Sequence, residues 1–515
     1  MKNGFRQSMA WLHTWSGLLV GWILFAIFLT GTAAYYRDEI SRWMRPELHA
    51  GSAITPAEAT AAAVTFLRKR APDSTSWIIG LPSAREPVLT LYWHDPAVRR
   101  FASAVVDPAT GKQISARDTM GGEFFYRFHF QLHMPPVWGR WIVGFCAMFM
   151  LVAIISGVIT HKRIFKDFFT FRPGKAPLRS WLDAHNATAV LGLPYHLVMT
   201  YSGLVTLMFM YMPWGISAAY PQGSDDFFSQ SLGTPVSVEA SHQPAALGDV
   251  AAMVASAAKA WNGAPITRVN VQHPTDAAGR VEVIEGSGNR LNLDGRSMTF
   301  ASSDGHLIHA SQGQTHAGAA RGVMYGMHVG RFAGPLLRVF LFLCGLAGSV
   351  MVASGLVLWA IKEKQKHIKT GSHFGLRLVD ALNIGAITGL LIAMGAFFLA
   401  NRIIPASYAG RSHAEIYVFF AAWATAVLAA FVKPSRKMWQ LQMGVAGLMF
   451  ASLVVVNALT GDASLVQSIT ARDWPMAGFD VVTFLLGLLF VWTSYRIGHW
   501  TPPVPRRNAR AEVTA

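Results

Sequence analysis

Histidine is the residue type whose placement most suggests chemistry in this sequence. The chain has 18 histidines, and several stand inside or at the ends of long apolar segments, where an ionisable side chain usually marks a functional site. Along those segments they form an inner layer, an outer layer and one middle position: His13, His161 and His185; His129, His133 and His328; and His196. Imidazole is the usual axial ligand of a haem that is not covalently attached. The layering therefore suits two haem b groups stacked across a membrane, each bound by two histidines.

Each layer offers one pair of ligands and one substitute. The predicted pairs are His13 with His185 for the inner haem, and His129 with His328 for the outer haem. His161 is the inner substitute, and His133, one helical turn after the predicted outer ligand, is the outer substitute. A single histidine at a helix end is as often an interfacial hydrogen-bonding group. The prediction therefore depends on the recurrence of these positions in both layers.

Three further residues stand where they could serve such a site. His196 follows His185 by eleven residues, which on one helix places it about 16 Å deeper and on the same face. It fits either a cofactor-site residue or a polar side chain that joins neighbouring helices. Arg140 and Arg338 lie near the outer starts of two apolar segments, where a guanidinium can pair with a haem propionate. Anchoring at the membrane surface is an equally favoured interpretation of both arginines.

Other metal sites fit the composition less well. Two cysteines in the whole chain exclude a four-cysteine zinc site and an all-cysteine iron–sulfur cluster. The sequence has no CxxCH motif for covalent haem attachment. Zinc or copper would want thiolates or carboxylates close by, and the apolar segments contain almost no Asp or Glu. The composition therefore favours haem.

The segments that carry these histidines predict an all-α polytopic membrane protein. Of 515 residues, 52% are hydrophobic and 14% are charged, which excludes a disordered chain, a nucleic-acid-binding tail protein and a small disulfide scaffold. Eight segments are long and apolar enough to span a lipid bilayer: 15–36, 138–160, 187–212, 334–360, 379–400, 414–432, 439–459 and 476–496. Every second connection is rich in Lys and Arg, which explains the net charge of +16 and predicts cytoplasmic N- and C-termini. The first segment is too long for a signal peptide, so we expect a retained anchor.

Two long connections are predicted to lie outside the cytoplasm, at 37–137 and 213–333. Each begins with a helical pattern and continues into alternating strand-like runs separated by turns. We therefore expect two small α+β domains, each tethered to the membrane at both ends. The remaining predicted units are the four membrane segments 1–36, 138–160, 187–212 and 334–360, a four-helix membrane extension at 379–496, and a cytoplasmic tail at 497–515.

The first four spans show signs of an internal duplication. Spans one and three align at an offset of 172 residues, and spans two and four at an offset of 198. At these offsets like residues coincide: His13 with His185, Gly31 with Gly203, Arg140 with Arg338, and Gly157 with Gly355. Identities are few, but the order of span, outward domain and span is the same in both halves. The pattern predicts a four-helix core built from a duplicated unit.

Several stretches resemble the PepSY-associated transmembrane family of bacterial inner-membrane proteins. They lie within about 1–365 and include Leu12-His13-Thr14-Trp15, Phe128-His129, Leu132-His133, Gly139-Arg140, Asp183-Ala184-His185 and His328-Val329-Gly330. The resemblance implies a four-helix haem-binding core and PepSY domains in the two outward segments. The last four spans lie outside that pattern.

The resemblance also implies an inner-membrane oxidoreductase that passes electrons across the bilayer, reduces a periplasmic ferric siderophore and releases iron(II). No GxGxxG motif follows a predicted strand, so the electron donor has to be a separate cytoplasmic reductase or a membrane quinol. One alternative is a quinol-linked cytochrome b with another acceptor. Another is a non-enzymatic membrane protein whose outward domains bind an envelope partner. A transporter is disfavoured because the spans lack the intramembrane charges that ion coupling usually leaves.

Overall fold

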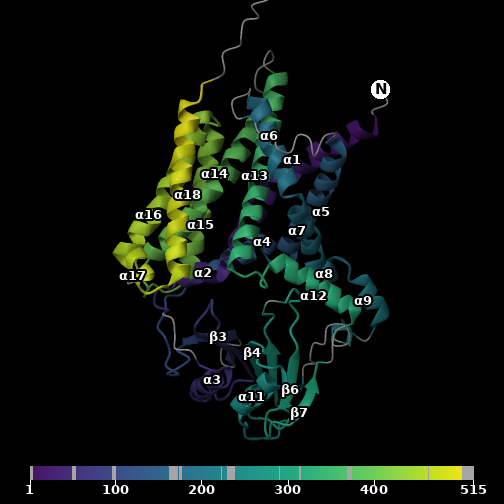
Figure 1. Cartoon of the computed structure of the whole chain (residues 1–515), viewed down its shortest axis with the longest axis vertical. Coiled ribbons are helices and arrows are strands. Elements are labelled where there is room, and N and C mark those ends of the chain that lie inside the picture. The colour runs from purple at the N-terminus through teal and green to yellow at the C-terminus, as the bar shows by residue number, and fades with distance from the viewer. Residues whose placement is uncertain are drawn as a thin grey trace, which may run out of the picture.

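The helices of the protein form a long bundle with a single β-sheet at one end (Figure 1). The computed structural model describes residues 4–48, 54–95, 100–161, 172, 177–221, 223–224, 226–228, 238–288, 290–311, 315–367, 374–461 and 463–501. The first helix begins, and the last helix ends, at the end of the bundle away from the sheet.

Seven helices within the described residues are long and apolar enough to cross a membrane. They are α1 (Phe5–Ala34), α5 (Pro136–Thr160), α13 (Pro335–Lys366), α14 (Phe374–Ile403), α15 (Arg411–Val432), α16 (Arg436–Thr460) and α18 (Trp474–His499). These helices coincide with seven of the eight predicted spans, and they confirm a polytopic membrane protein.

The remaining predicted span, 187–212, is not one continuous helix. Its residues are divided among α6 (Pro177–Leu191), α7 (Leu193–Thr206) and α8 (Met208–Tyr211). Pro194 explains the first break, because a proline inside a helix has no N–H to donate and its ring clashes with the carbonyl one turn earlier. The break places His185 and His196 on different helices, so the expectation of one shared helix is corrected.

Short helices lie between the membrane bundle and the sheet. They are α2 (Arg37–Trp43), α4 (Gly122–Gln131), α9 (Trp214–Ala219) and α12 (His316–Val329). In the bundle, α1 packs between α5 and α13, α6 packs against α13, and α7 packs against α5 and α12. All four predicted haem ligands are carried by α1, α4, α6 and α12.

The strands of both outward segments join in one antiparallel sheet with the order β3-β2-β1-β4-β5-β6-β7. The strands are β1 (Ser76–Gly80), β2 (Leu89–Asp95), β3 (Arg100–Val106), β4 (Ile266–Gln272), β5 (Arg280–Glu285), β6 (Ser297–Ala301) and β7 (Leu307–Ala310). The two halves meet where β1 pairs with β4, with Trp77 opposite Val271 and Ile79 opposite Val269. Their inward side chains pack with α3 (Pro56–Arg70) and α11 (Val250–Ala260) in one core.

This sheet changes the expected domain organisation. The sequence predicts two separate domains at 37–137 and 213–333, and each segment does contribute a helix followed by strands. Because β1 pairs with β4 along the whole length of β1 and the apolar faces of the strands share one core, the two segments form a single unit. We call the seven strands with α3 and α11 the sheet domain.

The last four membrane helices pack directly against the core. The helix α14 contacts α1 and α13 and is the most buried of the four. The Trp22 indole of α1 donates a hydrogen bond of 2.8 Å to Asn383 of α14, and the Trp43 indole of α2 donates one of 2.8 Å to Asp480 of α18. At the end of the bundle that faces the sheet, α17 (Leu465–Thr470) precedes α18. These contacts hold the last four membrane helices against α1 and α2.

Glu285 at the end of β5 should be important for the stability of the sheet domain. Its carboxylate is almost fully buried and forms ion pairs of 2.7 Å with both Arg290 and Arg296. Burial alone would raise its pKa, but hydrogen bonds from the two arginines hold the pKa at about 2. We expect Glu285→Gln to destabilise the protein at pH 7 by about 1–3 kcal/mol, the usual contribution of hydrogen bonds to a charged group.

The pH dependence has a definite sign. A carboxyl whose folded pKa is depressed stabilises the protein above its unfolded pKa of about 4.3 and loses this effect as the pH falls toward 2. The difference in thermal stability between the wild type and Glu285→Gln, measured on the full chain in detergent, should therefore shrink below about pH 4. An exposed carboxyl, Glu239, provides the control substitution to Gln. A difference that persists unchanged at low pH would contradict this account.

Candidate functional site

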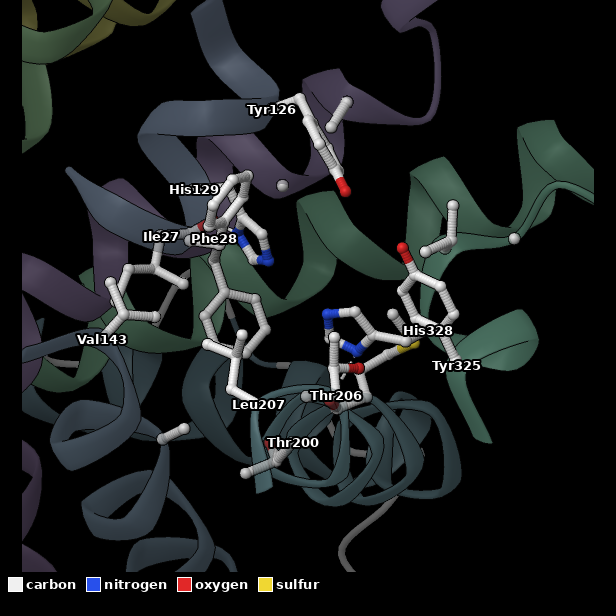
Figure 2. A pocket seen from close by; sticks show the side chains of 18 of the residues that line it. Ile27, Phe28, Tyr126, His129, Val143, Thr200, Thr206, Leu207, Tyr325 and His328 are labelled. Carbon is white, nitrogen blue, oxygen red and sulfur yellow. Dashed lines mark hydrogen bonds between the residues drawn. The ribbon is translucent and has the colours of Figure 1, made fainter. Parts of the chain in front are cut away.

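The outer histidine pair consists of His129 on α4 and His328 on α12. The centroids of the two rings are 5.9 Å apart and the ring planes differ by 31°. Nδ1 of His129 lies 2.8 Å from the carbonyl of Ile27, and Nδ1 of His328 lies 3.0 Å from the carbonyl of Met199. Figure 2 shows one nitrogen of each ring facing the other across a cavity.

The inner pair consists of His13 on α1 and His185 on α6. Their ring centroids are 6.2 Å apart and the planes differ by 65°. Nδ1 of His13 lies 2.8 Å from the carbonyl of Ala153, and Nδ1 of His185 lies 2.9 Å from the carbonyl of Met351. The inner pair therefore repeats the arrangement of the outer pair.

The carbonyl contacts determine which ring nitrogen is available to a metal. A carbonyl oxygen can only accept, so in all four residues Nδ1 carries the proton and donates it. The lone pair is then on Nε2, which is how a metal-bound histidine is usually held. With metal–nitrogen bonds of about 2 Å, two imidazoles on opposite sides of one iron have centroids about 6 Å apart. Both pairs fit a bis-histidine haem by this measure.

The acceptor carbonyls follow the duplication found in the sequence. Ala153 and Met351, the inner acceptors, are 198 residues apart. Ile27 and Met199, the outer acceptors, are 172 residues apart. These are the offsets of spans two and four and of spans one and three. Because the acceptors played no part in finding those offsets, the agreement is independent support for a duplicated core.

Four glycines give the histidine rings their space. A Cβ built on Gly31 would be 2.5 Å from Nδ1 of His129, and one on Gly203 would be 2.9 Å from Cε1 of His328. The same relation holds in the inner layer, where Gly157 faces His13 and Gly355 faces His185. Each glycine again has its partner at the offset of the duplication. The small residues of the core are therefore placed where a ring approaches the backbone of a neighbouring helix.

A cavity adjoins each pair. The outer cavity has a volume of about 380 Å³ and the inner one about 560 Å³, within the range of ordinary ligand sites. Leu24 and Met150 line both cavities, so only a thin wall separates them. The two sites therefore lie one above the other along the bundle, as the layering of histidines predicts.

The substitute ligands lie in different surroundings. His133 is exposed, its backbone has a positive φ of 53°, and its ring packs against Phe124 and Phe420 outside both cavities. His161 lines the inner cavity at the end of α5, and its buried Nδ1 has no hydrogen-bond partner within the described residues. His196 is buried and also lines the inner cavity. Neither His133 nor His161 belongs to either pair of facing histidines.

The two predicted arginines differ from one another. Arg140 lines the outer cavity, and its buried Nε has no hydrogen-bond partner among the residues described. Arg338 forms an ion pair of 2.9 Å with Glu39 and is not part of the cavity lining. The prediction that both could meet a propionate is therefore corrected for Arg338. The neighbour that neutralises it, Glu39, is remote in sequence, and the pattern of spans gave no sign of this contact.

Sequence reasoning also missed polar residues at the mouth of the outer cavity. Four further arginines line it: Arg37, Arg85, Arg321 and Arg331. The first three form ion pairs with Asp38, Glu39 and Asp294, respectively. Arg331 forms no ion pair within the described part of the chain. In the sequence, the sign that Arg331 could belong to the site was its position directly after His328-Val329-Gly330. Tyr126 and Tyr325, one turn before the two outer histidines, also reach this mouth (Figure 2).

Comparisons place the chain among known proteins. Residues 10–362 match the family described as the PepSY-associated TM region, which covers both histidine pairs and the sheet domain. An uncharacterised protein of Pseudomonas aeruginosa is 24% identical over 383 residues, and this alignment covers 68% of the chain and 89% of that protein. The family match ends before α14, so the last four membrane helices lie outside it. The chain therefore belongs to the PepSY-associated transmembrane family.

Proposed function

We propose that this protein is an inner-membrane haem b oxidoreductase that moves electrons across the bilayer to a periplasmic ferric siderophore. The observation that carries the proposal is the pair of stacked sites, in each of which two imidazoles held through Nδ1 face one another with centroids about 6 Å apart. When bound, haem supplies one-electron redox chemistry. If the N- and C-termini lie in the cytoplasm, as the sequence predicts, the inner site would face a cytoplasmic electron donor.

The residues of the chain have distinct tasks in this scheme. His13 and His185 would hold the inner haem iron through Nε2, and His129 and His328 would hold the outer one. The backbone carbonyls hold each ring in the tautomer that ligation requires. Leu24 and Met150 line both cavities and separate the two sites.

The chemistry of iron release supports a ferric siderophore as the proposed acceptor. A ferric siderophore holds iron(III) with hard oxygen ligands, and one-electron reduction gives iron(II), which the same ligands hold poorly. The outer cavity opens toward Arg85, which belongs to the loop between β1 and β2 of the sheet domain. The acceptor would therefore dock between the sheet domain and the outer pair. The donor is a separate reductase or a quinol.

The first test is a difference spectrum, dithionite-reduced minus oxidised, of the purified full chain with a haem count. We expect a b-type spectrum and about two haems per chain. A colourless protein from haem-replete cells would reject the proposal. Mixing the reduced protein with a ferric siderophore then tests the acceptor, because haem reoxidation should match the appearance of iron(II). Reoxidation by other acceptors alone would leave the quinol-linked cytochrome b in its place.

Arg140 and Arg331 are expected to hold the two propionates of the outer haem. They are the two arginines of the outer cavity that form no ion pair within the described residues. Removing a positive charge disfavours the reduced haem, so substitution of either by Gln should lower the outer midpoint potential by tens of millivolts, where about 59 mV is tenfold in the equilibrium. Spectroelectrochemical titration measures this. Arg268→Gln, an exposed change on β4, is the control, and an equal shift there would contradict the assignment.

A further inference from the structure

One buried histidine is not used by either site. His196 lies on α7 with an exposed fraction of 1%, three residues before Met199, whose carbonyl holds the outer ligand His328. It lines the inner cavity together with Leu24 and Met150, which line both cavities. Phe28, which lines the outer cavity, meets its ring edge-on with centroids 5.9 Å apart. The imidazole therefore forms part of the wall between the two sites.

This histidine breaks the duplication, and its surroundings change with it. At the offset of 172 residues, Leu24 stands in the place of His196 and Val20 in the place of Gly192. At the offset of 198, Met150 stands in the place of Gly348. A Cβ on Gly192 would be 2.5 Å from Cε1 of His196, and one on Gly348 would be 3.0 Å from its Nε2. One half of the core has thus exchanged three apolar side chains for one imidazole and the space to hold it.

The ring nitrogens of His196 make no close hydrogen bond to the described part of the chain. Neither nitrogen of His196 has a hydrogen-bond partner within the described residues, although the Cys344 carbonyl is near enough to act on the ring. The titratable groups around it are Tyr195 on α7, Tyr35 through its hydroxyl contact of 3.0 Å with Tyr195, and the Cys344 thiol on α13. No charged side chain of the described chain acts on the ring.

A buried polar atom without a partner is unfavourable, so its presence in a folded protein calls for a functional explanation. In a wall of low dielectric constant, an added electron on either side raises the proton affinity of a neutral imidazole, because opposite charges attract strongly there. We infer that His196 takes up one proton when the paired sites gain an electron and returns it when the electron leaves. The inference rests on the proposed function, which supplies electrons from a reductase or a quinol.

The charges balance in each half of the cycle. One electron enters from the donor, and one proton enters from the cytoplasmic side and adds to the unprotonated ring nitrogen of His196. The inner cavity supplies this route, because it includes His196 and the outer cavity does not. When the electron passes to iron(III), the N–H bond breaks and the proton leaves by the same route. In this scheme His196 holds the compensating proton near the two sites and does not bind iron.

The test is a spectroelectrochemical titration of the haem-loaded full chain between about pH 5.5 and 8.5, the range in which histidine titrates. In the wild type, at least one midpoint potential should fall as the pH rises, by up to tenfold in the reduction equilibrium per pH unit, which is about 59 mV. His196→Leu copies the other half of the core and should lose that part of the slope while keeping two haems. His196→Gln keeps a polar side chain that cannot titrate and should lose it too.

The outcomes separate this inference from the proposed function. Protein without haem rejects the proposed function and the inference together. Two haems with the same pH slope in the wild type, His196→Leu and His196→Gln reject the inference alone. A slope lost in His196→Leu but kept in His196→Gln also rejects it, because polarity rather than protonation would then be responsible. If His196→Leu does not fold, His196→Gln decides.

Discussion

A His185→Ala protein should bind one haem instead of two. His185 provides one of the two facing nitrogens of the inner pair, and its ring is fixed by the Met351 carbonyl. With only His13 left, the inner haem would lose one of the two histidines that would hold it in its cavity. The outer pair shares no ligand with the inner one, so the outer haem should remain. The haem count and the amplitude of the reduced-minus-oxidised band should both fall by about half.

His133→Ala is the matched control for this prediction. The ring of His133 lies outside both cavities and packs against Phe124 and Phe420, so two haems should remain. Loss of a haem in this variant would mean that His133, and not His129, binds the outer haem. Retention of both haems in His185→Ala would remove the inner assignment. The two variants thus test the choice between ligand and substitute that the sequence left open.

The sequence was most informative where local physics decides the structure. Apolar runs long enough to span a bilayer predict helices whatever packs around them, and seven of them are present as predicted. The pairing of the histidines did not follow from distance along a membrane helix, because His129, His185 and His328 lie on helices that are not among the seven long apolar ones. Pro194 was visible in the sequence too, but a hydropathy pattern averages over one residue and conceals the break between α6 and α7.

Contacts between remote segments could not be predicted in this way. The pairing of β1 with β4 joins residues separated by almost 200 positions, and alternation within a strand says nothing about its partner. Arg338 looked equivalent to Arg140 because the duplication aligns them, yet the carboxylate of Glu39 reaches only one of the two. His196 is another such position, because the repeat aligns it with Leu24 although the two side chains differ. A weak repeat in sequence identifies equivalent positions, and the structure shows which of them have diverged.

Gly31→Ala should weaken binding of the outer haem even though it leaves every ligand in place. The new Cβ would stand 2.5 Å from Nδ1 of His129, so the ring has to move and its 2.8 Å hydrogen bond to the Ile27 carbonyl has to lengthen or break. Overpacking of this kind typically destabilises by about 1–3 kcal/mol, and a lost hydrogen bond adds about 0.5–1.5 kcal/mol. In the haem-free protein the ring can turn away from the added methyl group, so its return to the iron-binding position costs free energy of this order, and about 1.4 kcal/mol would lower haem affinity tenfold.

Gly478→Ala on α18 separates this effect from a general response of a membrane helix to an added methyl group. A Cβ at Gly478 meets nothing within 4 Å and lines neither cavity, so this variant should keep both haems with unchanged retention during dilution. If Gly31→Ala retains its outer haem as well as Gly478→Ala does, then the position of the His129 ring is not what the cofactor requires. If it loses only the outer haem, the glycine, the ring and the carbonyl act together as one site. Gly203 faces His328 in the other half of the duplication. Loss of the outer haem in Gly203→Ala as well would show that both glycines make room for a haem-binding histidine.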